Sequence, residues 1–171
     1  VRPSRGHRRG RFGLSADHPG RYDPPMPRFL DRWFGRRGRR LIPRQFRRDG
    51  AICIHVPKCA GSALLDAWLG YQTGHVTAAA YRAADPDRAY VFAFVRDPVA
   101  RFVSAYDHIQ TGDLWPYLAE MRAAVNRHGE SLDQVAVGLG PESDLLRLPW
   151  FAPQHTFLEI GGRIAVNRVF K

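Results

Sequence analysis

Two stretches of the sequence each place a cation directly after a short apolar run. In "AICIHVPKCAGSALLDAWLG", residues 51–70, the run ends at Pro57 and Lys58, passes Gly61 and Ser62, and resumes with helical spacing. A strand, a tight turn and a helix N-terminus together favour phosphate binding, because unpaired backbone N–H groups and the helix dipole converge on an anion. Lys58 would add a point charge there. The alternative is a purely structural turn.

The second stretch, "FVRDPVARFVSAYDH", ends its apolar run at Arg96, whose charge needs a partner. Helical spacing would place Arg101, Ser104 and His108 on one face of the helix that follows. A structural ion pair involving Asp97 is the alternative explanation for these charges. Two cation-bearing turns suit a ligand with two separated anionic groups, which bind at the carboxyl ends of parallel strands.

Neither turn matches the loop of nucleoside triphosphatases. That loop needs a glycine, four residues, and then Gly-Lys-Ser/Thr, whereas Lys58 precedes its glycine. A small P-loop kinase is the alternative enzyme class, and the absent Gly-Lys-Ser/Thr argues against it. Competition of ATP against adenosine 3′,5′-bisphosphate would discriminate the two.

The elements that must position these residues follow from hydrophobic periodicity. We expect buried strands at 52–56 and 90–95, a helix at 64–69 that ends at Gly70, and a helix that begins at Pro98. Asp97 has the right position to cap the second helix. Its expected apolar face consists of Val99, Phe102, Val103 and Tyr106.

Weaker patterns complete the prediction. Leu118, Met121 and Val125 indicate another helix, residues 131–139 a short one, and "FLEIGGRIAV" a hairpin that turns on Gly161 and Gly162. Two apolar strands that each lead at once into a helix are typical of parallel strands in an α/β layer fold.

The charge is distributed unevenly along the 171 residues. The formal net charge is +10, but residues 1–50 alone contribute +11, with 15 arginines and 4 aspartates. We therefore expect residues 1–48 to form a basic tail rich in Arg, Gly and Pro, disordered or loosely packed, and residues 49–171 to form the domain. Within the tail, "PRFLDRWFGRRGRRLI" could rest on an anionic surface, anchor the tail to the domain, or be upstream sequence read as protein.

Composition also narrows the class of protein. Cys53 and Cys59 lack metal-site spacing and indicate no disulfide framework, and Cys53 fits a buried apolar position. No apolar stretch is long enough for a membrane span and no signal peptide is visible, so we expect a cytoplasmic protein. The tail arginines have no base-stacking pattern, so specific nucleic-acid binding is not expected.

The two stretches together resemble the sulfotransferases that use 3′-phosphoadenosine 5′-phosphosulfate (PAPS). The similarity covers roughly residues 50–170, and the nearest branch is the carbohydrate type that includes heparan sulfate 2-O-sulfotransferase and small bacterial relatives. The resemblance implies a P-loop-like three-layer α/β fold with a central parallel sheet flanked by helices. Because that domain normally continues past the hairpin, it also implies a domain that is incomplete at the C-terminus.

The resemblance assigns roles to particular residues. The family's Pro-Lys-x-x-Gly-Ser/Thr turn holds the 5′-phosphosulfate, and its Arg-Asp-Pro-x-x-Arg-x-x-Ser motif holds the 3′-phosphate. Cys59 stands where threonine is commoner, and Gln154 lies in "LPWFAPQHTFL", which is similar to a further family segment. The nucleotide-binding residues implied are Pro57, Lys58, Cys59, Ala60, Gly61, Ser62, Ala63, Arg96 and Ser104.

The catalytic residues implied are Lys58 and His75. "TGHVTAAAY" resembles the family segment that carries the proposed base, so His75 would remove the acceptor proton and Lys58 would stabilise the leaving phosphate. A histidine titrates near neutrality, which suits this task. Without the resemblance, His75 would be an ordinary polar loop residue, His55 a structural residue at a strand end, and His108 a further candidate for ligand contact.

The resemblance thus implies transfer of a sulfuryl group from PAPS to a hydroxyl of a saccharide or small molecule, with no metal required. A non-enzymatic alternative is a truncated, inactive domain that binds anions or nucleotides and carries a basic tail. Contact of that tail with anionic surfaces would be weak and dependent on salt.

Overall fold

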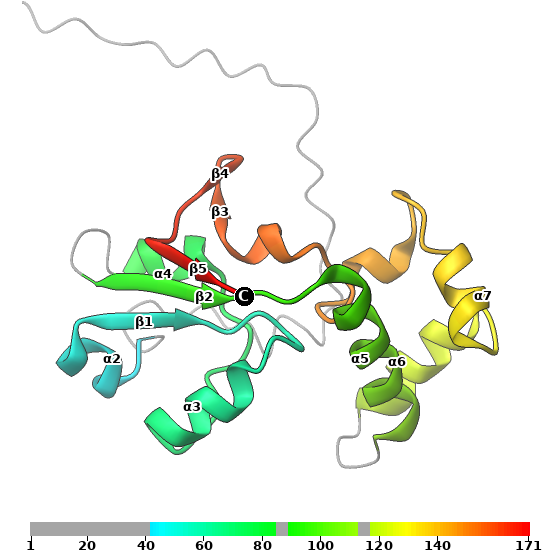
Figure 1. The fold of residues 1–171 in the computed structure, drawn as a ribbon, viewed down its shortest axis with the longest axis horizontal. Coiled ribbons are helices and arrows are strands. Elements are labelled where there is room, and N and C mark those ends of the chain that lie inside the picture. The colour runs from blue at the N-terminus through cyan, green and yellow to red at the C-terminus, as the bar shows by residue number, and fades with distance from the viewer. Residues whose placement is uncertain (1–41, 85–88, 113–116) are drawn as a thin grey trace, which may run out of the picture.

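The computed structural model describes residues 42–84, 89–112 and 117–171. The described chain forms a mixed α/β structure around a three-stranded parallel sheet (Figure 1). The sheet has the order β1-β2-β5, and its strands are β1 (Ala51–Ile54), β2 (Tyr90–Phe94) and β5 (Arg168–Phe170). The parallel pairing expected for the two apolar runs is confirmed. Both strands end one or two residues earlier than expected, because the chain leaves the sheet there to form the two turns.

Helices surround the sheet and extend beyond one end of it (Figure 1). The helical elements are α2 (Arg44–Asp49), α3 (Gly61–Leu69), α4 (Ala78–Ala84), α5 (Pro98–Thr111), α6 (Tyr117–Asn126), α7 (Leu132–Val137) and the 3-10 turns η2 (Asp144–Arg147) and η3 (Gln154–Phe157). The predicted hairpin is present as β3 (Glu159–Ile160) and β4 (Arg163–Ile164), with Gly161 and Gly162 in the left-handed region. Among the helices of the described residues, none is long and apolar enough to cross a membrane.

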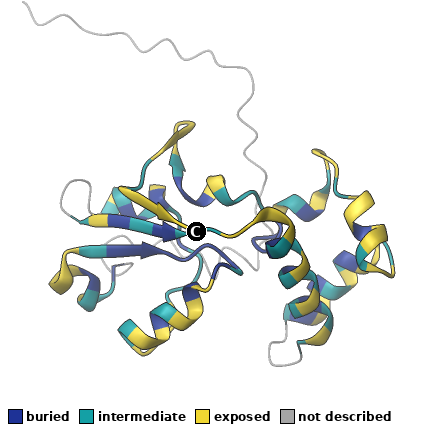
Figure 2. Cartoon of the chain, viewed as in Figure 1, coloured by how far each residue is buried: buried dark blue, intermediate teal, exposed yellow. Residues whose placement is uncertain are grey.

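The described residues bury two hydrophobic clusters, seen as the dark segments of Figure 2. One cluster surrounds the sheet and includes residues of α2, α3 and α4, such as Phe46, Leu65 and Tyr81. The other lies among α5, α6 and α7, with Ile109 and Met121 at its centre. Because β2 leads directly into α5, the turn between them lies where the two clusters meet.

The boundary expected at residue 48 is wrong for the last residues of the predicted tail. Ile42 is 5% exposed and Phe46 is fully buried in the sheet cluster. Phe46 packs against Trp68 of α3, with ring centroids 4.8 Å apart. An aromatic side chain surrounded by arginines in the sequence can still be buried when its helix presents one face to the core. The rest of the tail, with the amphipathic segment, lies almost entirely outside the described residues.

The predicted apolar face of α5 is only partly correct, because Phe102 and Tyr106 pack against the second cluster while Val99 and Val103 are exposed. Val99 is 70% exposed and Val103 is 41% exposed, while the buried residues of the helix are Arg101, Ala105 and Ile109. Helical periodicity cannot identify this face, because an arginine occupies one of its positions. The charged guanidinium can be buried on this face because backbone carbonyls accept its hydrogen bonds.

Candidate functional site

The first turn, residues 55–60, leads into α3 without a side-chain cap for the first backbone N–H groups of that helix. Lys58 and Ala60 have φ angles of 63° and 61°, in the left-handed region that non-glycine residues rarely adopt. Ala60 is the N-cap of α3 and has no side-chain oxygen to satisfy the first N–H groups of the helix. Those groups belong to Gly61, Ser62 and Ala63, three of the residues assigned to nucleotide binding. Unpaired N–H groups at a helix N-terminus are an arrangement that favours an anion.

Gly61 is required by packing at the start of α3. A Cβ atom at this position would overlap the imidazole ring of His55, which is 5% exposed. The ring closes the underside of the turn, and its Nε2 lies 3.5 Å from the Ser62 hydroxyl. His55 is thus a structural residue at the end of β1, as the sequence indicated.

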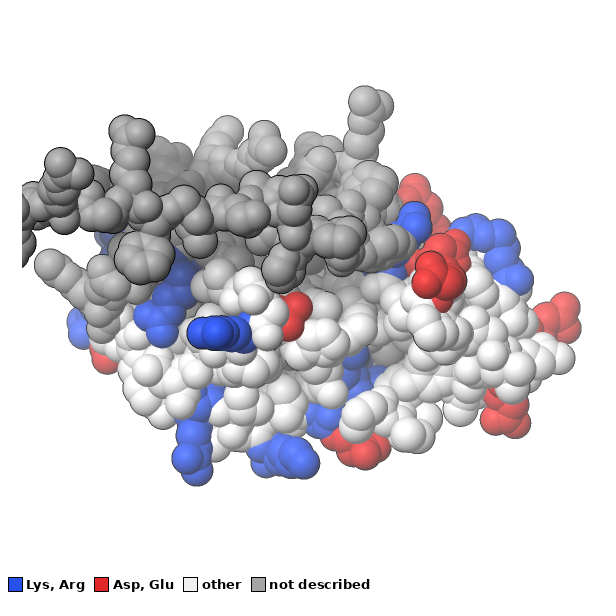
Figure 3. All heavy atoms as spheres, turned by 90° about the horizontal axis from the view of Figure 1, so that it is seen from above, with Lys and Arg blue, Asp and Glu red and all other residues white. Residues whose placement is uncertain are grey.

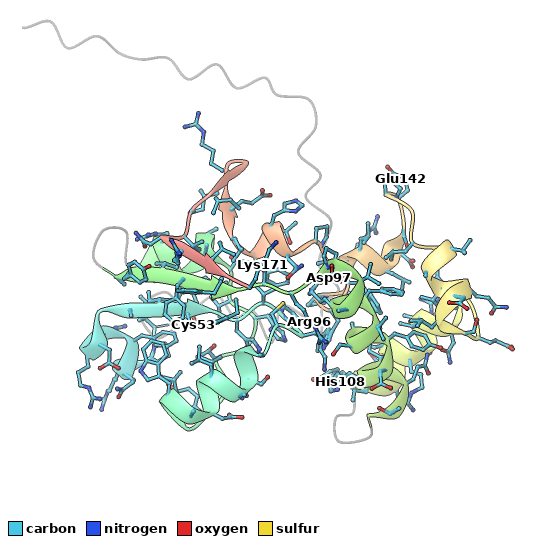
Figure 4. The ribbon with its side chains drawn as sticks, in the orientation of Figure 1. Cys53, Arg96, Asp97, His108, Glu142 and Lys171 are labelled. Atoms are coloured by element: carbon cyan, nitrogen blue, oxygen red, sulfur yellow. The ribbon has the colours of Figure 1, made fainter. Side chains whose placement is uncertain are left out.

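The second turn places Arg96 and Asp97 between β2 and α5 (Figure 4). The Asp97 carboxylate accepts a hydrogen bond of 2.9 Å from the backbone N–H of Ala100, so it caps the helix as expected. This bond explains Asp97 without the ion pair considered as an alternative. The Arg96 side chain is exposed, and among the described residues its guanidinium has no hydrogen-bond partner.

Lys58 interacts electrostatically with Asp107 of α5 and with Arg96 of the second turn. Its side chain is partly buried, and burial lowers the pKa of the ammonium group, an effect that Asp107 opposes and Arg96 reinforces. Burial and the charge of Lys58 likewise lower the pKa of His108. Figure 4 shows His108 on α5, beyond the turn that carries Arg96. Two cations of different turns therefore share one electrostatic neighbourhood with Asp107 and His108.

The buried side chain of Arg101 hydrogen-bonds to backbone carbonyls of distant segments instead of facing a ligand site. Its Nε donates to the carbonyl of Pro57 at 2.9 Å, and its two terminal nitrogens donate to the carbonyls of Ala152 and Pro149 at 2.9 Å and 3.1 Å. Burial lowers the pKa of the guanidinium. The side chain thus joins the first turn to a distant segment, and backbone carbonyls take the place of the ion pair considered as the alternative.

Gln154 in the same distant segment contacts both turns. Its Oε1 accepts from the backbone N–H of Arg96 at 2.9 Å, and its Nε2 donates to the Arg96 carbonyl at 2.8 Å. The same Oε1 accepts the thiol of Cys59 at 3.2 Å. Burial raises the pKa of Cys59, which keeps the thiol protonated for this bond.

His75 lies behind the first turn, against His55 and Trp150. Its Nδ1 is 3.1 Å from the carbonyl oxygen of His55, and since a carbonyl only accepts, Nδ1 carries the proton. Nε2 is then the basic nitrogen, and it has no hydrogen-bond partner among the described residues. The ring centroids of His75 and His55 are 4.5 Å apart, and those of His75 and Trp150 are 5.5 Å apart.

Both histidines are neutral over the physiological range. Burial lowers the pKa of His75 to about 3, and the charge that His55 can carry acts in the same direction. Burial also lowers the pKa of His55 to about 4. The expectation that His75 titrates near neutrality is therefore not met, because the ring lies in a poorly solvated place.

A cavity of about 330 Å³ adjoins the segment that carries Gln154. Arg101 and Gln154 both contribute to its wall, together with the aromatic side chains Phe102, Trp150 and Phe151. Trp150 also contacts His75, so the cavity borders the neighbours of that histidine.

Exposed acidic side chains lie mainly at the far end of the molecule, which α6 and α7 form (Figure 3). The residues there are Glu120, Glu130, Asp133, Glu142 and Asp144.

The structure brings the predicted nucleotide residues into one region at the carboxyl edge of the sheet. Residues 57–63 form the first turn and the start of α3, Arg96 stands in the second turn, and Ser104 lies partly buried on α5. The sequence did not predict the hydrogen bonds by which Arg101 and Gln154 link distant segments of the chain. It also did not predict the proximity of Asp107 to Lys58. Only the Pro-Gln pair hinted at Gln154, and no signal distinguished Arg101 from a ligand.

The model of the sulfotransferase family matches residues 45–133, just over half of the chain, and this range contains both turns and His75. No curated protein and no solved structure matches the chain. Because this model covers more than half of the chain, including both turns, the chain belongs to the sulfotransferase family.

Proposed function

We propose that the protein transfers a sulfuryl group from PAPS to a hydroxyl group of a saccharide or small-molecule acceptor. The observation that carries this proposal is the pair of turns at one edge of the sheet, one bearing Lys58 and unpaired N–H groups, the other bearing Arg96. PAPS has anionic groups on both its 5′ and 3′ sides, and two separated cationic turns suit such a ligand. Membership of the sulfotransferase family supports sulfuryl transfer in general.

The proposed donor contacts follow the family resemblance. The backbone of residues 57–63 and the Lys58 side chain bind the 5′-phosphosulfate, and Arg96 and Ser104 bind the 3′-phosphate. Lys58 lies partly buried, where its charge acts more strongly than in water. In the reaction, the bond between sulfur and the bridging phosphate oxygen breaks and a bond between sulfur and the acceptor oxygen forms. Lys58 stabilises the charge that develops on the phosphate.

The acceptor hydroxyl must also lose its proton, and we assign that proton to Nε2 of His75. The bond from Nδ1 to the His55 carbonyl supports this role, because it fixes the tautomer and leaves Nε2 unprotonated. The lowered pKa makes His75 a weak base. His108 is the competing candidate, since it lies partly buried near Lys58.

The acceptor class follows the resemblance to the carbohydrate branch. The aromatic walls formed by Phe102, Trp150 and Phe151 support it, because the apolar face of a sugar ring packs well on aromatic side chains. Trp150 contacts both this cavity and His75, which is the arrangement that an acceptor site beside the base requires.

Calorimetric titration tests the donor assignment. We expect adenosine 3′,5′-bisphosphate to bind at least about tenfold more tightly than adenosine 5′-monophosphate, because only the former engages both turns. Equal affinities for the two nucleotides would contradict the proposal, and tighter binding of ATP would favour a kinase. Tight bisphosphate binding without transfer from PAPS to any of a panel of saccharides would favour the inactive binding domain.

A further inference from the structure

The sheet by itself does not set the distance between the two anion turns. The register of β1 and β2 ends at the pair Ile54 and Ala93, before either turn begins. Residues 57–60 and Arg96 lie beyond this last pair. Another contact must therefore fix the spacing at which two anionic groups of one ligand would be held.

Gln154 makes that contact with one amide group. It binds the backbone of Arg96 through both its nitrogen and its oxygen, like a neighbouring strand, and its oxygen receives the Cys59 thiol of the first turn. The amide orientation is unambiguous, because the N–H of Arg96 requires an oxygen as its acceptor. A single side chain thus connects both turns.

Arg101 fixes the position of Gln154 in turn. The carbonyls of Pro149 and Ala152 belong to the segment that leads into Gln154, and both accept hydrogen bonds from the Arg101 guanidinium. The third bond of this buried side chain runs to Pro57 in the first turn. Because α5 starts at the second turn, one network links both turns to the Gln154 segment.

We propose that Gln154, held in place by Arg101, is a positioning residue that keeps the two turns at the spacing needed to bind both phosphates of one nucleotide. The proposal rests on the function proposed above. Without Gln154, each turn still binds its own phosphate, but a bisphosphate must first order one turn against the other. The free energy needed for this ordering weakens the binding of a ligand with both phosphates, but it does not weaken the contact with either phosphate alone.

Substitution Gln154→Met tests this assignment, because methionine has nearly the same length but cannot form the three hydrogen bonds. We expect the affinity for adenosine 5′-monophosphate to stay within about twofold of the wild type. The ratio of affinities for adenosine 3′,5′-bisphosphate and the monophosphate should fall by about tenfold. A residue that merely supports the fold would lower both affinities together.

The matched control is Gln134→Met on α7. Gln134 also accepts a backbone hydrogen bond through its side chain, from Glu130 at 2.8 Å, but α7 lies away from both turns, in the acidic part of the molecule (Figure 1). Its substitution should leave the ratio unchanged. If Gln154→Met does not fold, Cys59→Ala cuts the one Gln154 bond that reaches the first turn, and the ratio should fall there as well.

Two negative results are distinguishable. A wild-type protein that prefers the bisphosphate, together with a Gln154→Met or Cys59→Ala protein that keeps the same ratio, would overturn the positioning role alone. A wild-type protein that does not prefer the bisphosphate would overturn the proposed function and this inference with it.

Discussion

Lys58 and Arg96 differ in what they are expected to do for the same ligand. Lys58 would touch the transferred group in both the ground state and the transition state, so Lys58→Ala should reduce nucleotide affinity and turnover together.

Arg96→Ala should weaken the binding of adenosine 3′,5′-bisphosphate by about tenfold to a hundredfold, because it removes charge-assisted bonds to a phosphate. Calorimetry on both variants, with Arg163→Ala in the exposed hairpin as the control, measures this. Unchanged bisphosphate affinity in Arg96→Ala would contradict the assignment.

The role of His75 predicts a separation of binding from rate. His75→Ala should lower turnover by about 10²–10⁴-fold while leaving nucleotide affinity unchanged, because the phosphates are held elsewhere. Since burial lowers the pKa of His75 to about 3, the rate should be independent of this group between pH 6 and 8 and should fall only in strong acid. Steady-state assays of His75→Ala and His108→Ala check this. If only His108→Ala loses turnover, His108 is the base.

Among the elements, α2 shows how a segment with a tail-like composition joins the core. Phe46 is fully buried and packs on Trp68, whose indole N–H donates to Asp49 at 2.7 Å. Phe46→Ala should therefore destabilise the protein by about 3–5 kcal/mol, through lost burial and the cavity that remains. Denaturant unfolding measures the change, with exposed Arg44→Ala as the control. A loss below about 1 kcal/mol would show that α2 does not belong to the folded core.

At the scale of the whole molecule, two buried neutral histidines make stability depend on pH. The pKa values of His55 and His75 are lowered in the folded state, so the unfolded chain binds more protons below its ordinary histidine pKa of about 6.5. The contribution of the two histidines to the free energy of unfolding is fully present above that pH, and it is lost as the pH drops towards 4. With two protons taken up on unfolding, the slope approaches about 2.7 kcal/mol per pH unit.

Denaturant unfolding between pH 4.5 and 7.5 measures this slope. His75→Gln should roughly halve it, because one of the two protons is then no longer taken up. Substitution of exposed His155 by Gln is the control. A wild-type stability that does not change over this interval would show that the histidines are solvated in the folded protein.

The sequence alone determined the features that depend on local patterns. The apolar runs, the Asp97 cap, the terminating Gly70 and the Gly161-Gly162 hairpin follow from periodicity and from backbone preferences, and the structure has all of them. The pairing of a strand-end cation with a helix start also indicated where the two turns lie, and anion binding by these turns stays a prediction. These signals lie within a few residues of one another, so no knowledge of distant contacts was needed to find them.

Only the tertiary structure decided how these features act together. Arg101 lies on a helix face that periodicity assigned to solvent or ligand, and its role depends on carbonyls 44, 48 and 51 residues away. The low pKa of His75 likewise depends on burial against His55 and Trp150, which local sequence does not encode. Desolvation and backbone hydrogen bonds between distant segments exist only after the chain has folded. They determine whether a charged or titratable residue binds a ligand, holds the backbone or stays neutral.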